Sequence, residues 1–508
     1  MRAPKISKSF ARFVAIRALM ALLLFMTLAA WSMGSAVGGS PDEDYVLTSI
    51  WCGTDGNPPY CRKDPDRANA MILPIMAAEP SLCFRQLGQD YSAKCQEGIY
   101  DQEISTDFYN SANLYPDTYF RVIRSFVGID VESSVVKMRL FNSFLAAILI
   151  VTASAFVWNK NSDFLLAWLA VIAPVSIYFI TSVNTSSWNL IGVTVFVVSF
   201  TSALKNRKKL KLSIPGAAMA LFAVWFTNAS RYEGKYVILL LTAAILYSEF
   251  APKRFKLTKK LILIGSPILP VIYLTFEYFS KTYNQVSIFN DQRVEVSEGI
   301  TTTANNLLVN NIITLPRFIT GFFGSWGLGW FELEITSTVW LFTLQAFLLI
   351  IVFSLRKSRN FHRRIFGALF TIMCVAILYA NQQRFAKVGE YIQPRYFLPF
   401  FLGIVIIAAA NKTERYPNSL VVTVAILSTI SNSIALRDTI RRYTTGQDVL
   451  ISKSLNNPIE WWWQFGPQPE TVWLAGTLAF AALWAILIYD RNKEELNAPN
   501  SPAPELAN

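Results

Sequence analysis

The sequence predicts an all-α integral membrane protein with about twelve transmembrane helices and long extracytoplasmic loops. Three observations predict this class: the apolar residues come in blocks, the basic residues gather in alternate loops, and four of the five cysteines fall in one loop. Hydrophobic residues make up 53% of the 508 residues, and the mean hydropathy is +0.35. The blocks are about twenty residues long, which is the length that a helix needs to cross about 30 Å of hydrocarbon.

Several of the expected spans are short or contain proline. Such helices are tolerated in a membrane where neighbouring helices satisfy the freed backbone groups. The turn SVNTSSWN is so short that the two spans beside it form either a helical hairpin or a broken helix. The expected spans are residues 14–36, 138–158, 164–183, 188–204, 213–229, 236–250, 261–279, 338–355, 364–381, 396–410, 418–436 and 471–489.

The first apolar block has the features of either a signal peptide or a retained helix. We expect a retained helix, because a long polytopic chain follows, and the next segment is extracytoplasmic in both cases. With the N-terminus inside, the cytoplasmic loops include KNRKKLKL, RKSRNFHRR and NKTERYPN, so that basic residues concentrate on that side. Both termini are then cytoplasmic. We expect a multi-pass protein of the cell membrane that is surrounded by the lipid bilayer.

The net charge of +12 is explained by this topology. A nucleic-acid surface would gather its basic residues on one face or along one helix. Here they are dispersed among short loops between helices, so no nucleic-acid partner is expected.

Cys52, Cys61, Cys83 and Cys95 all follow the first span, in the loop assigned to the extracytoplasmic side. An even set in such a loop indicates two disulfides in an oxidising compartment. Three pairings are open, of which the local one, the first with the second and the third with the fourth, is the simplest. A zinc site is the alternative, but no CxxC spacing is present and the one histidine, His362, lies far away on the cytoplasmic side.

The longest and most polar segments share one outer face, and no internal repeat relates the two halves. Many secondary transporters are built from repeats and place ionisable residues at mid-membrane. The asymmetry therefore favours a protein that acts at the outer leaflet over one that carries a substrate across the membrane. The expected segments are the N-terminus and first helix (1–37), a first loop with disulfides (38–137), helices two to seven (138–279), a second long loop (280–337), helices eight to eleven (338–436), a third loop (437–470), and the last helix and tail (471–508).

Three carboxylates, Asp42, Glu43 and Asp44, lie a few residues beyond the first span in the stretch SPDED. One interpretation is structural: Ser40 as N-cap, Pro41 at the first helical position and Glu43 form a capping box. That interpretation does not account equally for the two aspartates, which point about 200° apart on a helix. The other interpretation places Asp42 at the phosphate level of the outer leaflet, where a carboxylate accepts a proton from a hydroxyl or binds a divalent cation.

A lipid-linked phosphate at this depth requires cationic donors, and the guanidinium fork of arginine provides them. Four basic residues lie at external span edges, where the topology rule does not require them; each is alternatively an anchor that reaches the headgroups. These residues are Arg231, Lys235, Arg384 and Arg395. Asp44, Asn184 and Tyr396 complete the candidate substrate-binding residues.

Four stretches, in order along the chain, carry a resemblance to a known family: SPDEDYVLTSIWCG, SVNTSSWNLIGV, RYEGK and YIQPRYFLPF. On these stretches the chain resembles the domain-of-unknown-function 2142 family, bacterial membrane proteins placed in the GT-C glycosyltransferase superfamily. One position departs from the pattern, since Val46 stands where a histidine is expected.

The resemblance implies a GT-C-like fold and an inverting enzyme that transfers a sugar from a polyprenyl-phosphate donor to a cell-envelope glycan or glycoprotein outside the membrane. It implies Asp42 or Glu43 as the catalytic base or as ligands of a divalent cation, Mg²⁺ or Mn²⁺, and Arg384 and Arg395 as phosphate contacts. Attack opposite the departing phosphate inverts the anomeric carbon through an oxocarbenium-like state. No GxGxxG or P-loop pattern is present, which agrees with a donor that is not a nucleotide.

Two other functions stay open. Twelve spans with both termini inside also suit a transporter or flippase for a lipid-linked sugar or a small solute. An inactive scaffold for envelope assembly is the third hypothesis, which Val46 favours. The disulfide-bearing first loop and the lack of repeat symmetry favour the transferase over the transporter.

Overall fold

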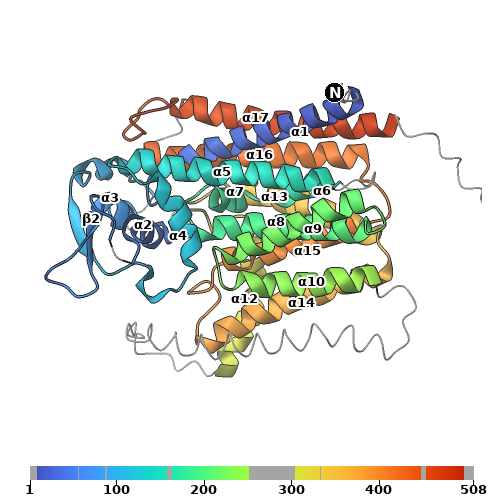
Figure 1. The fold of residues 1–508 in the computed structure, drawn as a ribbon, viewed down its shortest axis with the longest axis horizontal. Coiled ribbons are helices and arrows are strands. Elements are labelled where there is room, and N and C mark those ends of the chain that lie inside the picture. Colours follow the sequence, from blue (N-terminus) through green and yellow to red (C-terminus); the bar gives the residue numbers. More distant parts are fainter. Residues whose placement is uncertain are drawn as a thin grey trace, which may run out of the picture.

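The computed structural model describes residues 8–54, 56–85, 89–156, 163–250, 304–331, 333–447 and 454–496. Long helices lie side by side in a bundle, and a smaller unit covers one end of it (Figure 1). We call this unit, formed by the described residues between 38 and 130, the cap, and the end of the bundle that it covers the cap end. The opposite end is the far end.

Eight helices of the described part are long and apolar enough to cross a membrane. This finding supports a mostly helical, multi-pass membrane protein, whereas the expected number of twelve spans is not confirmed. The eight helices are α1 (Lys8–Met33), α5 (Val131–Phe156), α8 (Thr185–Lys205), α9 (Leu210–Asn228), α13 (Ser337–Arg356), α14 (Asn360–Gln383), α16 (Asn418–Thr444) and α17 (Pro469–Leu496).

Two further expected spans are present as shorter helices. The span expected at 236–250 is α10 (Gly234–Phe250), with 17 residues, and the span expected at 396–410 is α15 (Leu398–Ala410), with 13 residues. A 3₁₀ turn, η4 (Pro394–Tyr396), precedes α15. The second long loop, where described, contains the helix α12 (Ala304–Gly321), and the span expected at 261–279 lies outside the described residues.

The span expected over 164–183 is divided into two parts. The chain forms two short helices there, α6 (Phe164–Val171) and α7 (Pro174–Ile180), and every residue of both is buried. The break falls at Pro174 because proline lacks the N–H that a continuing helix would use and is well suited to a first helical position. A broken helix therefore runs through the interior of the bundle, where its freed backbone groups are enclosed by protein.

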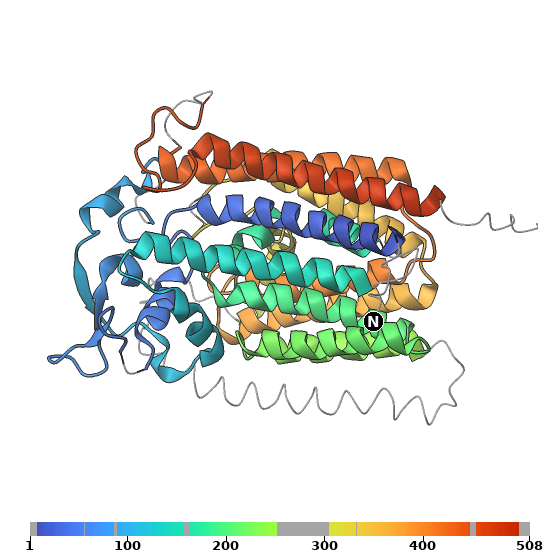
Figure 2. The ribbon, with the colours of Figure 1, turned by 45° about the horizontal axis from the view of Figure 1, so that its top comes forward.

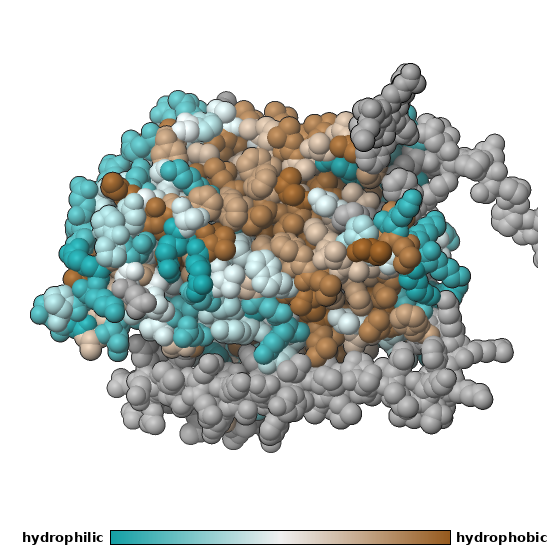
Figure 3. Space-filling model, in the orientation of Figure 1, coloured by the Kyte–Doolittle hydropathy of each residue, from teal (hydrophilic) through white to brown (hydrophobic). Residues whose placement is uncertain are grey.

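On the coloured part of the face in Figure 3, hydrophilic residues cover both ends and hydrophobic side chains form a band between them, as expected of a membrane protein. Figure 2 shows α1 between α5 and α17. At the far end, Arg17 near the start of α1 pairs with Asp490 near the end of α17 at 3.1 Å. The described start and end of the chain thus lie together, opposite the cap; which end faces the cytoplasm stays a prediction.

The cap adds one small sheet to the otherwise helical chain. Its three strands pair antiparallel in the order β1-β2-β3. The strands are β1 (Arg62–Lys63), β2 (Met71–Pro74) and β3 (Glu103–Thr106), and the helices are α2 (Glu43–Cys52), α3 (Ile75–Ala78), α4 (Asp117–Ile123), η1 (Ala93–Gly98), η2 (Asn110–Ala112) and η3 (Arg124–Phe126).

Two disulfides connect neighbouring parts of the cap, Cys52 with Cys61 and Cys83 with Cys95. This is the local pairing among the three that the sequence left open. A small unit with a limited apolar core gains stability from such bonds because they restrict its unfolded chain.

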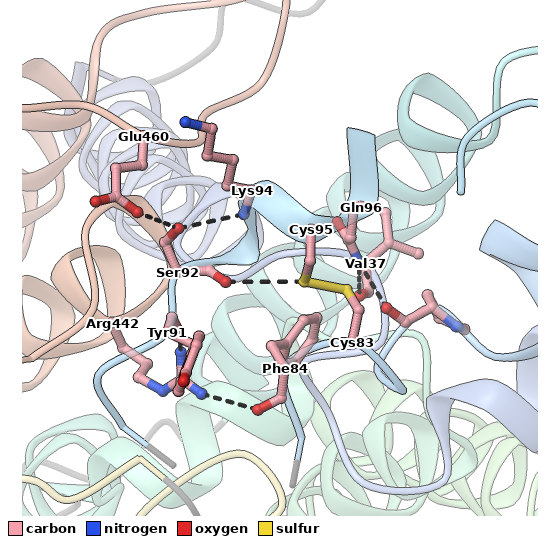
Figure 4. Close-up of a disulfide and its surroundings, with 11 residues drawn as sticks. Val37, Cys83, Phe84, Tyr91, Ser92, Lys94, Cys95, Gln96, Arg442 and Glu460 are labelled. Carbon is pink, nitrogen blue, oxygen red and sulfur yellow. Dashed lines mark hydrogen bonds between the residues drawn. A yellow bond between two sulfur atoms is a disulfide. The ribbon is translucent and has the colours of Figure 1, made fainter. Parts of the chain in front are cut away.

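Beside the second disulfide, the cap is attached to a distant part of the chain (Figure 4). The Ser92 hydroxyl donates at 2.6 Å to Oε2 of Glu460, which lies in the segment between α16 and α17. The guanidinium of Arg442, on α16, donates to the backbone carbonyls of Phe84 and Tyr91. These bonds fix the cap to the bundle from one side.

A buried ion pair attaches the cap from the other side. Arg139 of α5 is 1% exposed and Glu43 at the start of α2 is 0% exposed, and their closest atoms are 2.8 Å apart. Glu43 Oε1 also accepts the backbone N–H of Val183, in the turn between α7 and α8, at 3.1 Å. Arg139 further donates to three carbonyls at the end of α1, those of Ser32, Ser35 and Ala36.

The expected capping box at SPDED is only half present. The backbone N–H of Ser40 donates to Glu43 Oε2 at 3.4 Å, which is one of its two bonds. The other is missing, because the N-cap residue is Asp42, and the buried Ser40 hydroxyl has no partner within the described residues. Glu43 is oriented mainly by Arg139, which a local motif does not include.

We expect Glu43→Gln to lower the free energy of unfolding by about 3–5 kcal/mol, because it leaves the Arg139 charge buried without its counter-ion. Thermal and denaturant unfolding of the purified protein in detergent measure the change. The matched control is Glu103→Gln, which breaks the solvent-exposed pair with Arg62 and is expected to change stability little. Equal effects of the two substitutions would contradict the structural role of Glu43.

Candidate functional site

A cluster of charged and aromatic side chains lies where the cap meets the bundle. Asp42 comes from the segment that opens α2, Arg395 and Tyr396 from η4, Arg231 from the turn between α9 and α10, and Tyr115 from the cap. We call these five residues the junction cluster. Four of the five are candidates that the sequence analysis selected from separate loops.

Asp42 has a left-handed backbone, with φ 61° and ψ 9°. That conformation costs a residue other than glycine about 1–2 kcal/mol, although aspartate tolerates it better than most. The preceding carbonyl, of Pro41, accepts hydrogen bonds from Asn184 Nδ2 at 2.8 Å and Arg395 Nη1 at 3.1 Å. These bonds hold the backbone so that the Asp42 carboxylate faces the bundle, with its side chain 34% exposed.

Arg395 is the direct partner of Asp42. Its Nη2 lies 2.6 Å from Asp42 Oδ2 and donates to the Tyr396 hydroxyl at 3.1 Å. The guanidinium carbon lies 5.4 Å from the centre of the Phe179 ring and 5.0 Å from that of Tyr396. Burial alone would lower the pKa of Arg395, but the Asp42 carboxylate outweighs it and raises the pKa above the ordinary value.

Arg231 is the second buried cation of the cluster, 3% exposed. Its Nη1 is 2.5 Å from Glu233 Oε1, and its guanidinium carbon is 5.3 Å from the ring centres of both Tyr115 and Tyr396. Burial would lower the pKa of Arg231, whereas Glu233 raises it, with the net effect of a higher pKa. Burial also raises the pKa of Tyr115 to about 12, against the nearby positive charge of Arg231, so this phenol stays neutral near pH 7.

Each of the two arginines keeps a buried donor unused. Arg231 Nε and Arg395 Nε have no hydrogen-bond partner among the residues that the structure describes. Buried polar groups are normally satisfied, because an unpaired one costs about 1–3 kcal/mol. Both guanidinium groups lie near the Tyr396 ring, so each brings to its neighbourhood an unused donor that a polar ligand bound there would satisfy.

The other two carboxylates of SPDED have different surroundings. Glu43 is enclosed by Arg139 and backbone, so it is not placed to act as a base or metal ligand toward a substrate. Asp44 lies 3.3 Å from Arg85 Nη1 and accepts the N–H of Tyr45 at 2.8 Å. Arg85 in turn lies over the ring of Trp330, 4.3 Å from its centre.

For three more candidates the structure gives no direct contact with the side chains of the junction cluster. Asn184 caps α8 by accepting the N–H of Ser186 at 2.8 Å, besides its bond to the segment before Asp42. Lys235 and Arg384 are exposed, and the structure gives neither a contact with the junction cluster. Val46, the position that departs from the family pattern, is 1% exposed and packs in the hydrophobic core.

The sequence analysis missed Arg139, Tyr115 and Glu233. A signal existed for Arg139, since it is an ionisable residue inside a predicted span, where such residues are rarely unpaired. Glu233 lies in the stretch RYEGK, which drew attention to Arg231 and Lys235, whereas Tyr115 carried no such signal, because isolated tyrosines in loops are ordinary residues.

The described residues do not fit the expected divalent cation. They contain no group of three or more histidine, cysteine or acidic side chains that could hold a metal ion. Glu43, the expected second ligand, directs both carboxylate oxygens at Arg139. We therefore derive no chemical step through a metal.

The comparison with known families gives one match. Residues 24–404 match the family model described as Predicted membrane protein (DUF2142). No curated protein and no solved structure matches the chain.

We expect Asp44 to make stability depend on pH. Burial raises its pKa from 3.8 to about 6, so the folded protein binds this proton more tightly than the unfolded chain does. Its stabilising contribution is therefore full below about pH 4 and is lost as the pH rises through about 6. Between pH 4 and 7 the free energy of unfolding of the wild type should fall by up to about 3 kcal/mol relative to Asp44→Asn. Unfolding at several pH values measures it, and a constant difference would contradict the assignment.

Proposed function

Because this chain belongs to the DUF2142 family of predicted membrane proteins, we propose for it a reaction at a membrane surface: transfer of a sugar from a polyprenyl-phosphate donor to a cell-envelope glycan or glycoprotein acceptor. The proposal assigns the reaction to the junction cluster and requires the cap end to be extracytoplasmic. The resemblance to GT-C glycosyltransferases supports it at the level of the family pattern.

The single observation that carries the proposal is the pairing of Asp42 with buried Arg395, close to a Tyr396 ring that a second buried arginine, Arg231, also approaches. When a sugar leaves a phosphate, negative charge develops on the phosphate oxygen, and fixed cationic donors stabilise that charge. Arg231 and Arg395 supply two such donors, each with an unused Nε. Both guanidinium groups lie within 5.3 Å of the Tyr396 ring centre, so one phosphate group lying near this ring can be reached from both sides of the cluster.

The residues of the cluster can account for the proton and the negative charge that the reaction releases. An acceptor oxygen attacks the anomeric carbon on the face opposite the phosphate, and Asp42 takes the proton of that hydroxyl. The bond between the anomeric carbon and the phosphate oxygen breaks, and its electron pair stays on the phosphate, next to the arginines. Asp42 is suited to the base role because its side chain is one-third exposed, whereas Glu43 is enclosed.

Because Asp42 and Arg395 are paired, the donor phosphate must displace Asp42 from Arg395 when it binds. In the structure the two side chains neutralise each other at 2.6 Å. The donor phosphate is a phosphodiester monoanion that arginine binds as it binds a carboxylate, so it competes with Asp42 for the Arg395 donors. Binding of the donor would thus release Asp42 as a free carboxylate at the moment when a base is needed.

One observation favours the transport alternative. The broken helix formed by α6 and α7 runs through the interior, and many transporters bind their substrates at such discontinuous helices. Transport predicts movement of an intact lipid-linked sugar across proteoliposomes, with no release of polyprenyl phosphate. The product analysis below separates the two functions.

We expect Asp42→Asn to lower sugar transfer about 100-fold or more, because it removes the general base. The assay uses the purified full-length protein, a panel of polyprenyl-phosphate sugars, and detection of released polyprenyl phosphate. The matched control is Asp117→Asn, another cap aspartate that pairs with an arginine, Arg121, outside the cluster. Equal turnover in the wild type and Asp42→Asn would remove the proposed base.

We expect Arg395→Lys to raise the KM for the donor about tenfold, because lysine keeps the charge but loses the planar fork that matches a phosphate. The matched control is Arg384→Lys, which changes an exposed arginine that the structure places outside the cluster. An unchanged donor KM in Arg395→Lys would reduce Arg395 to a structural partner of Asp42.

A further inference from the structure

A cavity of about 500 Å³ lies at the far end of the bundle, opposite the junction cluster. Its walls come from the start of α6, the last turns of α8, the end of α10, the start of α14, and the end of α15 with the turn that follows. The volume falls within the range of small-molecule sites, about 300–1,000 Å³. Nothing in the proposed transfer reaction uses this cavity.

The charge of the cavity lining is strongly positive. Five basic residues face two acidic ones, and both acids are already paired. Asp163 lies 3.2 Å from Lys412 and 3.0 Å from Arg491, and Glu249 lies 3.7 Å from Arg207. The remaining basic residues of the lining are Lys205, Lys208 and Arg359.

These three remaining cations have no carboxylate partner within the part of the chain that the structure describes. Lys205 donates to the carbonyl of Ala410 at the end of α15, and no ion pair is found there for Lys208 or Arg359. Like charges around one cavity repel one another, and the repulsion is strongest beside a low-dielectric interior. An anion in the cavity would remove that repulsion.

Two unpartnered polar atoms provide a second, independent observation. Thr201 lines the cavity, is only 8% exposed, and its hydroxyl makes no hydrogen bond within the described residues. His362, the one histidine of the sequence, also lines it, and its Nδ1 is buried without a described partner. The Thr201 hydroxyl can donate a hydrogen bond to a ligand that has several acceptor oxygens, whereas a neutral His362 with its proton on Nε2 presents Nδ1 as an acceptor to a ligand hydroxyl.

The inner wall of the cavity is apolar. Phe164, Val197 and Ile406 line it and are at most 8% exposed. A cationic rim above an apolar wall suits an amphiphile whose anionic group faces the rim. Basic pockets between transmembrane helices, at the side facing the cytoplasm, are a known setting for phosphate-bearing lipid headgroups.

We propose that this cavity binds a phosphate group through Lys205, Lys208, Arg359 and the Thr201 hydroxyl. The phosphate belongs either to the headgroup of an anionic lipid of the adjacent leaflet or to a soluble phosphate compound. The site is separate from the junction cluster, since the two lie at opposite ends of the bundle. The proposal therefore does not depend on sugar transfer.

The test compares two double variants of the full-length protein. Lys208→Gln/Arg359→Gln removes two exposed cations of the lining, so the buried core is unchanged. The matched control, Lys211→Gln/Arg364→Gln, removes two exposed cations from the same end of the bundle that do not line the cavity. Both variants lose the same net charge. A difference in phosphate binding between them is therefore due to the cavity and not to the total charge of this end of the bundle.

Native mass spectrometry measures retention of phosphatidylglycerol against phosphatidylcholine, and calorimetry measures binding of inorganic phosphate and pyrophosphate. We expect the wild type and the control variant to bind a phosphate compound and Lys208→Gln/Arg359→Gln to bind it at least about tenfold more weakly. Selective retention of phosphatidylglycerol identifies the lipid source, and binding of inorganic phosphate or pyrophosphate alone identifies the soluble source.

Two results would overturn the proposal: a wild type that binds none of these compounds, or an equal loss of binding in both double variants. The second result would mean that the cations act only through the general charge of this end. Thr201→Val, which replaces the hydroxyl by a methyl group of similar size, is expected to weaken binding by a smaller factor while leaving the Tm of the unliganded protein unchanged.

Discussion

The buried pair of Glu43 and Arg139 is the interaction on which the cap end depends. Burying two charges is favourable only when the remaining donors and acceptors are satisfied, and here backbone groups of two other segments satisfy them. The pair thereby joins the end of α1, the start of α2, α5 and the turn before α8. Asp42 precedes Glu43 directly, so the fixed position of one carboxylate determines where the other points.

The neighbouring carboxylates of Asp42 and Glu43 have different roles because their surroundings differ. Glu43 is fully enclosed and acts as an anchor, whereas Asp42 stays one-third exposed beside Arg395. A left-handed backbone at Asp42 separates their directions, and the bonds that Asn184 and Arg395 make to the carbonyl of Pro41 stabilise that backbone. Asn184 was selected from the sequence as a substrate-binding residue, and its contacts instead make it a positioning residue for the cluster.

The molecule has two polar regions at its two ends, separated by the hydrophobic band. The junction cluster pairs its arginines with nearby acids and aromatic rings, while the far-end cavity has more cations than described acids to pair with them. A sequence rule that counts basic residues per loop treats the far-end residues as topology signals and does not account for the arginines of the junction cluster. Only their partners distinguish a residue that orients the protein in a membrane from one that is placed to bind an anion.

The sequence by itself determined the class of protein and the local features. Apolar blocks of helical length predict a multi-pass membrane protein because the bilayer imposes that length, and the cysteine spacing favoured the pairing that the structure has. Ordered motifs also located SPDED, RYEGK and YIQPRYFLPF, which supply Asp42, Arg231 and Arg395. Tertiary structure alone decided that these three lie together, that Glu43 belongs to Arg139, and that 164–183 is a broken helix. The reason is physical. Periodicity and composition describe the local preference of one segment, whereas the pairing of Asp42 with Arg395, 353 positions away, depends on how the helices pack.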